Sequence, residues 1–259
     1  MLKTERPENL LELCQQQGSL SVKQAARSFG ISEMTARRDF DELASAGRVI
    51  REHGGIRLPG ALQAPPTELP YFEKLTIRTQ EKQGIARTAC ELIEPNDTVF
   101  LGPGSTCASV ARMLPNVPLR VVTNSLIAFS ILQRNPALEI CVLGGQYRSR
   151  SGSLVGAVAE EMLAPLGIDK CFIGANGVND GTAFTSNLDE GRLQALACDR
   201  SGKRYLLCDA SKLGKQDFYN FYNLDRVDAL ITDDSIPAEQ RQQLGDATQL
   251  IIAPADATA

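Results

Sequence analysis

The spacing of apolar residues predicts three short helices in the first 45 residues. In the first helix, apolar side chains recur three and four positions apart within residues 10–14. The second begins at Ser21, with Gln24 three residues later, which is a capping-box signature, and Gly30 closes it. These signals predict two helices joined by a tight connection.

A third helix is predicted to begin at Ser32, and its two faces differ in polarity. Ala36, Phe40 and Leu43 share one face, which we expect to be buried. Asp39 leans toward that buried side, and we expect it to orient a neighbouring arginine rather than meet a ligand. The residues expected on the outward face and its flanks are Met34, Thr35, Arg37, Arg38 and Asp41.

Two short β-type segments follow this helix. "RVIRE" (48–52) and "IRL" (56–58) flank the glycine turn "HGG" (53–55). Three helices followed by a hairpin form a winged helix-turn-helix DNA-binding domain, which we assign to residues 1–58, with the helix-turn-helix at about 20–39. Periodicity alone also fits a helical hairpin with a solvated charged face, so that alternative stays open.

The character of the chain changes after residue 58. Residues 59–70 hold four prolines and few core-forming side chains, which predicts a linker. Within residues 71–259, seven apolar runs alternate with helical stretches of ten or more residues, which indicates an α/β domain with a largely parallel sheet. The runs are 98–101, 119–123, 139–144, 170–175, 204–209, 229–232 and 250–253.

Polar and glycine-rich residues follow five of these runs. Ligands bind outside the carboxyl ends of parallel strands, so we expect these residues to meet at one edge of the sheet. "GPGST" (102–106) offers backbone amides and hydroxyls at a helix start, which suits a phosphate. It is no Walker loop, because no Lys-Ser or Lys-Thr pair closes it. It is also no complete dinucleotide fingerprint, because Cys107 stands where the third glycine belongs. A plain strand-to-helix connection stays open.

The other loops carry groups suited to a small phosphorylated polyol. Arg148 and Lys212 add cations for a phosphate, and asparagine side chains suit sugar hydroxyls. Each residue alone also fits a solvated loop, so the prediction depends on the convergence of five loops. The predicted effector-binding residues are Gly102, Gly104, Ser105, Thr106, Asn124, Ser125, Gly144, Gly145, Arg148, Asn176 and Lys212.

Composition narrows the class of protein. The chain has 259 residues, of which 43% are hydrophobic and 22% charged, as expected for a globular protein with one large domain or two. It lacks an apolar stretch of about 18 residues and a signal-peptide pattern, so we expect a cytoplasmic protein without a membrane partner. The single histidine, His53, excludes zinc sites with two histidines, and we predict no metal, cofactor or catalytic residue. The seven scattered cysteines are expected to be reduced and buried.

Two sets of motifs resemble one known family over nearly the whole chain. "SVKQAARSFGISEMTARRDFDELASAGRVIREHGGIRL" (21–58) resembles the DNA-binding domain of the DeoR family of bacterial transcription regulators, where S-x-x-T-x-R-R-D and H-G-G recur in this order. Downstream, "FLGPGST", "VVTNSL", "LGGQYR", "FIGANGV", "LCDASKLG" and "LITDD" are similar to the effector domain of that family.

The resemblance implies a cytoplasmic regulator, usually a repressor of sugar-utilisation genes, that binds double-stranded operator DNA. It also implies a C-terminal domain that resembles ribose-5-phosphate isomerase and binds a phosphorylated sugar, which typically lowers operator affinity. By motif, Ser32, Met34, Thr35, Arg37 and Arg38 fall on the recognition helix, and His53, Gly54 and Gly55 on the wing, to which we add Arg51. Gly104, Ser105 and Thr106 match the phosphate loop, while Asn124, Gly144, Gly145, Arg148 and Lys212 match the sensor motifs.

Two positions depart from the family pattern. Asn176 stands where an aspartate is common, and Gln194 stands where a lysine often follows "NLDE" (187–190). Asn176 removes a candidate general base, but Asp180, Asp189 and Glu190 keep an isomerase-like enzyme open as the alternative function. An architectural DNA-binding protein without a ligand fits poorly with the acidic, loop-rich C-terminal part. One recognition helix reads one half-site, so we expect a homodimer or a higher homo-oligomer.

Overall fold

The computed structural model describes residues 6–17, 19–52, 55–57 and 68–254. The chain divides into two compact units, residues 1–67 and 68–259. Of the predicted linker, residues 59–67 lie outside the described residues, and residues 68–70 belong to the second unit. In the described part of the chain no helix is long and apolar enough to cross a membrane.

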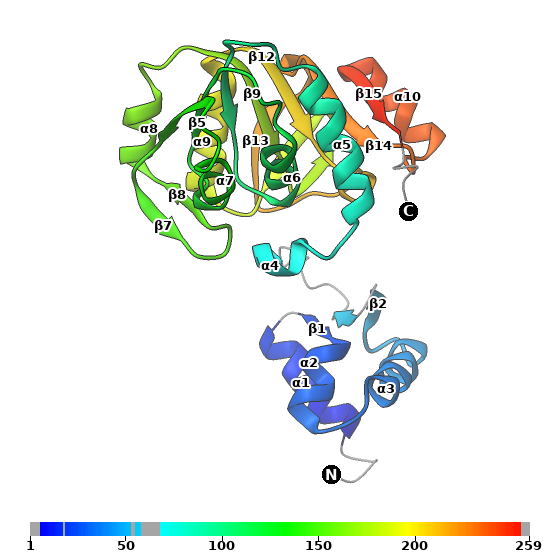
Figure 1. Cartoon of the computed structure of the whole chain (residues 1–259). Coiled ribbons are helices and arrows are strands. Elements are labelled where there is room, and N and C mark those ends of the chain that lie inside the picture. Colours follow the sequence, from blue (N-terminus) through cyan, green and yellow to red (C-terminus); the bar gives the residue numbers. More distant parts are fainter. Residues whose placement is uncertain (1–5, 18, 53–54, 58–67, 255–259) are drawn as a thin grey trace. The chain divides into compact units, whose positions relative to one another are not determined.

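The first unit contains helices and a small antiparallel sheet (Figure 1). The capping box predicted at the second helix is confirmed, because the backbone N–H of Gln24 donates to Ser21 Oγ at 3.2 Å and that of Ser21 donates to Gln24 Oε1 at 3.0 Å. The predicted hairpin is also confirmed as an antiparallel strand pair. The elements are α1 (Arg6–Gln17), β1 (Ser19–Ser21), α2 (Val22–Phe29), α3 (Glu33–Ser45), β2 (Ile50–Glu52) and β3 (Gly55–Arg57), with strand order β1-β3-β2.

The inner face of α3 forms part of the core of the first unit. Ala36, Phe40 and Leu43 are buried there, as predicted. Asp39 is buried as well, but the prediction that it orients a neighbouring arginine is wrong. Its carboxylate accepts two hydrogen bonds from Arg6, at 2.5 and 2.9 Å. Asp39 lies on the flank of α3 that meets the beginning of α1, so its partner comes from 33 residues away.

Seven parallel strands form the central sheet of the second unit (Figure 1). The seven apolar runs predicted as strands all belong to it, in the order β15-β14-β12-β9-β4-β5-β6. The strands are β4 (Thr98–Leu101), β5 (Leu119–Thr123), β6 (Leu138–Val142), β9 (Ile168–Gly174), β12 (Ser201–Leu207), β14 (Ala229–Asp233) and β15 (Gln249–Ala253). Two small antiparallel sheets add β7 (Gln146–Arg148) with β8 (Ser153–Val155), and β10 (Gly177–Asn179) with β11 (Thr182–Thr185) and β13 (Tyr219–Asn223).

Helices cover both faces of the central sheet. Along β4, Val99 and Leu101 pack toward α5, α6 and α7, whereas Phe100 packs toward α8 and α9. This alternation follows the two-residue period of a strand that is buried on both sides. The helices are α4 (Tyr71–Lys74), α5 (Thr79–Glu91), α6 (Ser105–Met113), α7 (Leu126–Leu132), α8 (Ala157–Leu163), α9 (Leu188–Asp199) and α10 (Ala238–Ala247), with short 3₁₀ turns at Ala210–Lys212 and Leu224–Arg226.

The direction in which strands are added reverses between β4 and β9. From β4 the sheet grows through β5 to β6, whereas β9 pairs with the opposite edge of β4 and leads to β12, β14 and β15. A doubly wound sheet leaves a crevice outside the carboxyl ends of its strands at such a switch point. The segments that follow β4 and β9 therefore meet at the place where a ligand site is expected.

Candidate functional site

The outward face of α3 carries the residues predicted to contact DNA. Ser32 caps the helix, since its Oγ accepts a hydrogen bond from the Thr35 backbone N–H at 3.1 Å and lies 2.9 Å from the Thr35 hydroxyl. Met34 is 80% exposed, and Arg37 and Arg38 are also exposed. The helix thus presents a polar face with basic side chains that does not take part in the core.

The two arginines of α3 differ in their partners. Arg37 Nη2 lies 3.4 Å from a carboxylate oxygen of Glu33, one turn earlier, and both side chains are largely exposed, so this pair contributes little. Arg38 forms no ion pair within the described residues. Arg38 therefore has the guanidinium that is more readily available to a nucleic acid.

Of the predicted wing residues, the structure describes Arg51 and Gly55. Arg51 donates to Asp41 at 2.7 Å and to the carbonyl of Gly55 at 2.6 Å, and its guanidinium lies 5.6 Å from the ring centroid of Phe40. These contacts connect α3 to the hairpin. A side chain at Gly55 would come within 2.6 Å of the Leu20 carbonyl, so the approach of β1 to β3 requires glycine there. His53 and Gly54 lie outside the described residues.

A cavity lies at the switch point of the second unit. It contains about 770 Å³ free of protein atoms, including the open solvent at its mouth. The segments at the carboxyl ends of β4, β9 and β12 line it, together with side chains from residues 68–77 and from α9. The predicted effector residues that line it are Gly104, Ser105, Thr106, Asn176 and Lys212.

The beginning of α6 supplies the anion-binding features of the cavity. Gly104 is the N-cap residue, with a φ of 118° that favours glycine and no side chain to cap the helix. Ser105 and Thr106 follow it at the cavity wall. The amides at a helix start favour a negative charge. Gly102 lies outside the lining, and a side chain there would come within 3.2 Å of Ile173.

Three lysines line the same cavity, and they differ in their contacts. Lys82 donates to the backbone carbonyls of Lys74 and Ile77 at 2.5 and 2.6 Å, and burial lowers its pKa. Lys74 donates to Asn176 Oδ1 at 3.2 Å, and burial lowers its pKa as well. Lys212 makes no ion pair within the described ranges, so it is the cation best placed to accept an anionic ligand.

Arg148 is held by two carboxylates of the cavity wall. Its guanidinium nitrogens lie 2.5 Å from Glu68 Oε2 and 3.2 Å from Glu190 Oε1. Glu68 also pairs with Lys74 at 3.2 Å. Burial raises the pKa of Glu68, but the hydrogen bond from Arg148 and the charge of Lys74 outweigh burial, so its pKa lies below the ordinary value. Glu68 thus places a negative charge at the cavity, and Arg148 itself is not part of the lining.

The remaining predicted effector residues do not line this cavity. Asn124 donates to the Leu154 carbonyl at 2.9 Å, and Ser125 caps α7 through the Ala128 N–H at 3.1 Å. Gly145 has a φ of 137°, and a side chain there would meet the Val155 carbonyl at 2.6 Å, whereas Gly144 packs against Met162. The structure gives these residues local roles around α7, β7 and β8, and their contact with an effector stays a prediction.

Several cavity residues were not predicted as site residues. Glu68, Lys74 and Lys82 precede the first strand of the sheet, so a rule about loops after strands does not find them. In the sequence, Gln194 stands out only as a departure from the family pattern.

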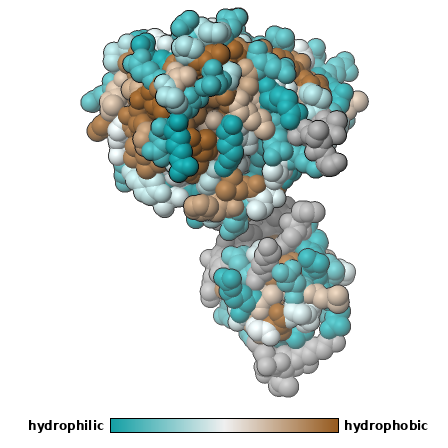
Figure 2. Space-filling view, viewed as in Figure 1, coloured by the Kyte–Doolittle hydropathy of each residue, from teal (hydrophilic) through white to brown (hydrophobic). Residues whose placement is uncertain are grey.

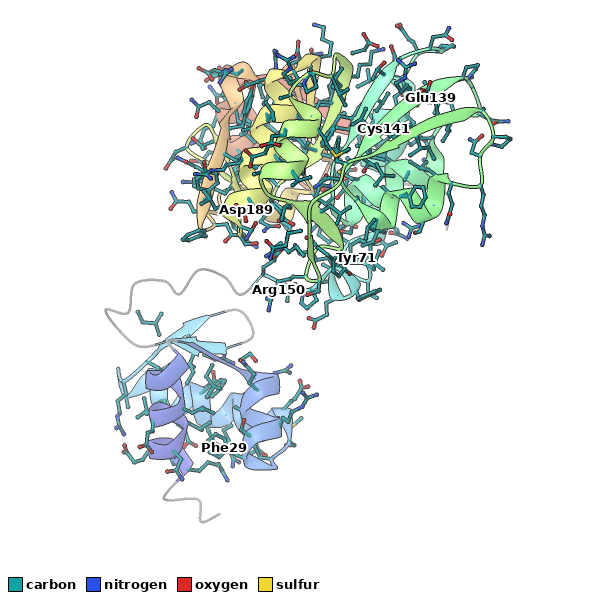
Figure 3. All side chains as sticks on the ribbon, turned by 90° about the vertical axis from the view of Figure 1, so that its left-hand side faces the viewer. Phe29, Tyr71, Glu139, Cys141, Arg150 and Asp189 are labelled. Carbon is teal, nitrogen blue, oxygen red and sulfur yellow. The ribbon has the colours of Figure 1, made fainter. Side chains whose placement is uncertain are left out.

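A backbone hydrogen bond joins the segment that begins with Glu68 to the loop after β7. The Tyr71 N–H donates to the Arg150 carbonyl at 2.9 Å. These two residues lie at the same end of the second unit (Figure 3).

The cavity offers little for redox or metal chemistry within the described residues. Five of the seven cysteines are buried and two are half-buried, so the predicted burial is confirmed for five of them, and their reduced state stays a prediction. Burial raises the pKa of the cavity residue Cys107 to about 12, which makes its thiol a poor nucleophile. No group of three histidine, cysteine or acidic side chains suited to a metal occurs in the described ranges.

Comparison with known proteins assigns both units to domains of one family. The DeoR-like helix-turn-helix domain matches residues 6–60, and the DeoR C terminal sensor domain matches residues 77–234. The lactose phosphotransferase system repressor of Staphylococcus epidermidis strain RP62A is 37% identical over 237 residues, 91% of this chain and 94% of the relative. The repressor of the same name from Lactococcus lactis subsp. lactis is 37% identical over 254 residues, 97% and 99% of the two chains. The structure of ribose 5-phosphate isomerase A from Methanocaldococcus jannaschii is 20% identical, with a TM-score of 0.38 over 51% of this chain and 53% of that one.

Proposed function

The chain belongs to the DeoR family, and on that premise we propose that it represses a carbohydrate-utilisation operon and releases operator DNA when a phosphorylated sugar occupies the cavity. Its relatives are named repressors, so it is a transcriptional regulator and not an enzyme. The observation that carries the proposal is the position of residues 68–77, which follow the DNA-binding unit in the chain and contribute to the cavity wall.

The proposed DNA contacts divide between base reading and positioning. Arg38, with Arg37 beside it, is suited to a bidentate contact with guanine in the major groove, and the hydroxyls of Ser32 and Thr35 are suited to backbone phosphates. The protein acts in the cytoplasm, where the operator is accessible.

The proposed effector bridges two sides of the cavity. Its phosphate binds at the start of α6, near Gly104 and Ser105, with Lys212 as the counter-charge. Its hydroxyls hydrogen-bond to the amide side chains of Asn176 and Gln194, which line the same cavity.

The effect on DNA binding is proposed to pass through Glu68. A phosphorylated ligand competes with the Glu68 carboxylate for Lys74, because both are anions in one cavity. Once Glu68 loses its contact with Lys74, the segment that begins with Glu68 no longer favours the conformation that binds the operator. A ligand shifts such an equilibrium only by its differential affinity for the two states, and the Glu68 contacts supply such a difference.

A second copy of the chain is proposed as a partner, because paired half-sites need two recognition helices. Tyr147, Val158 and Met162 on β7 and α8 are 57%, 56% and 40% exposed, near β6 at the sheet edge. Figure 2 shows hydrophobic surface on the side of the second unit where α8 lies. Val158→Asp is expected to yield a monomer in analytical ultracentrifugation, and an unchanged sedimentation coefficient would reject this surface.

The function is tested with the full-length protein. Selection from a random duplex library defines the operator, and fluorescence anisotropy then measures its affinity during titration with glucose 6-phosphate, galactose 6-phosphate, fructose 6-phosphate and ribose 5-phosphate. At least one of these is expected to weaken operator binding by roughly tenfold, which corresponds to a coupling of about 1.4 kcal/mol. Unchanged operator affinity with every sugar phosphate would reject the effector role, and binding without sequence preference would favour an architectural protein.

A further inference from the structure

One buried side chain of the cavity has an unused hydrogen-bonding group. Gln194, on α9, is 6% exposed and lines the cavity. Its Nε2 donates to the Gly174 carbonyl at 3.4 Å, while its Oε1 has no hydrogen-bond partner within the described residues. The orientation of the amide follows from chemistry, because a carbonyl oxygen accepts only and must face the Nε2 group.

This orphan acceptor sets Gln194 apart from the other amide of the cavity. Asn176 is satisfied on both sides, since its Oδ1 accepts from Lys74 at 3.2 Å and its Nδ2 donates to Ser186 at 3.1 Å. Asn124 also has an unpartnered buried oxygen, but it does not line the cavity. A buried acceptor without a donor destabilises the empty pocket, and a ligand that supplies an O–H or N–H removes that cost.

We propose that Gln194 is a specificity-determining residue of the effector site, where its Oε1 accepts a hydrogen bond from a hydroxyl of the bound sugar phosphate. The inference rests on the proposed function, and it specifies which part of the ligand Gln194 recognises. A phosphate oxygen at neutral pH is mainly an acceptor and repels Oε1, so Gln194 selects the uncharged, hydroxyl-bearing part of the ligand. The site therefore prefers a phosphorylated sugar to inorganic phosphate.

The test measures a ratio of affinities by isothermal titration calorimetry of the full-length protein. The probes are inorganic phosphate and the four sugar phosphates named above, and the ratio compares the tightest sugar phosphate with inorganic phosphate. Gln194→Met keeps the length of the side chain without the carboxamide oxygen and is expected to lower this ratio roughly fivefold, with inorganic phosphate affinity unchanged. Gln243→Met, the same change on an exposed residue of α10, is the matched control and should leave the ratio unchanged.

A second variant keeps the test valid if the first one does not fold. Gln194→Lys introduces the residue that is common at this position in the family and offers donors only, so it should bind inorganic phosphate more tightly and also lower the ratio. In addition, Gln194→Met loses the orphan oxygen together with only the long 3.4 Å hydrogen bond to the Gly174 carbonyl, so the melting temperature of the unliganded variant should not fall below that of the wild type. A merely structural role for Gln194 predicts a lower melting temperature.

The outcomes separate this inference from the proposed function. An unchanged affinity ratio in the variants, or a wild type that binds no sugar phosphate more tightly than inorganic phosphate, overturns the role of Gln194. Operator release by sugar phosphates, measured separately by anisotropy, decides the proposed function. A protein that releases DNA normally but shows the same ratio in Gln194→Met would thus reject only the specificity role.

Discussion

Glu68 and Arg148 form an ion pair at the wall of the cavity, although they lie 80 residues apart in the sequence. Their side chains are only 5% and 18% exposed. Glu68 is among the first described residues after the DNA-binding unit, whereas Arg148 belongs to β7 of the sensor. The pair therefore fixes the beginning of the sensor unit at the same place where the proposed effector enters.

Glu68→Gln is expected to change two affinities in opposite directions. Loss of the carboxylate removes a competing anion, so sugar phosphates should bind more tightly, and it weakens the contacts with Arg148 and Lys74, so the operator should bind less tightly. Each change is expected to be roughly fivefold to tenfold, at the lower end of typical coupling between two sites. Calorimetry and anisotropy measure the two effects. Glu73→Gln, on an exposed residue of α4, is the control, and parallel changes of both affinities would contradict the mechanism.

The same residue predicts a pH dependence of stability. The pKa of Glu68 in the folded protein lies below its ordinary value of 4.5, so folding favours the carboxylate. Its contribution to the free energy of unfolding is therefore complete above pH 4.5 and disappears as the pH falls through the lower folded-state pKa. Urea denaturation of the wild type should show a steeper loss of stability below pH 4.5 than that of Glu68→Gln. Identical slopes for the two proteins would show that Glu68 does not contribute.

The architecture was predictable because its signals are local. Each of the seven strands contains an apolar run, and both predicted helix caps rest on residues three positions apart, as at Ser32 and Thr35. The rule for ligands at the carboxyl ends of strands also found Gly104, Asn176 and Lys212, which line the cavity.

The parts that were missed depend on contacts between distant segments. Glu68 and Lys74 reach the cavity from a segment that precedes the first strand, and the sequence pattern says nothing of where that segment packs. The same holds for Asp39, whose partner Arg6 is brought near only when α1 packs beside α3. Arg148 follows a strand, as the rule requires, but a carboxylate from elsewhere holds its guanidinium.

Arg38→Ala is expected to weaken specific operator binding strongly and to leave the fold intact. The side chain is exposed and has no ion pair within the described residues, so its loss should change the melting temperature little. A bidentate contact with guanine contributes about 1–3 kcal/mol, so affinity should fall roughly tenfold to a hundredfold. Gel-shift titration measures this, with Arg200→Ala on an exposed residue of the second unit as the control. Normal affinity of Arg38→Ala would reject its role.

Asp39→Ala, one residue further, should act on stability instead. It leaves the Arg6 guanidinium, with a side chain only 10% exposed, without its bidentate partner. Breaking such a pair is expected to cost about 2–3 kcal/mol of unfolding free energy in the first unit. Hydrogen exchange of the full-length protein measures this loss as reduced protection of the backbone amides in the first unit. If Asp39→Ala lost operator affinity with unchanged exchange protection, Asp39 would be a DNA contact and not a structural residue.

Lys212→Ala tests the phosphate side of the cavity. Lys212 lines the cavity without an ion pair in the described part of the chain, so its charge is available to the ligand, whereas Lys74 already pairs with Glu68. A hydrogen bond to a charged group contributes about 1.5–3 kcal/mol, so the affinities for inorganic phosphate and for sugar phosphates should both fall by roughly tenfold or more. Lys215→Ala removes the same charge from an exposed position three residues away and should leave both affinities unchanged. Equal losses in the two variants would mean that the general field of the protein attracts the anion, and that Lys212 makes no specific contact.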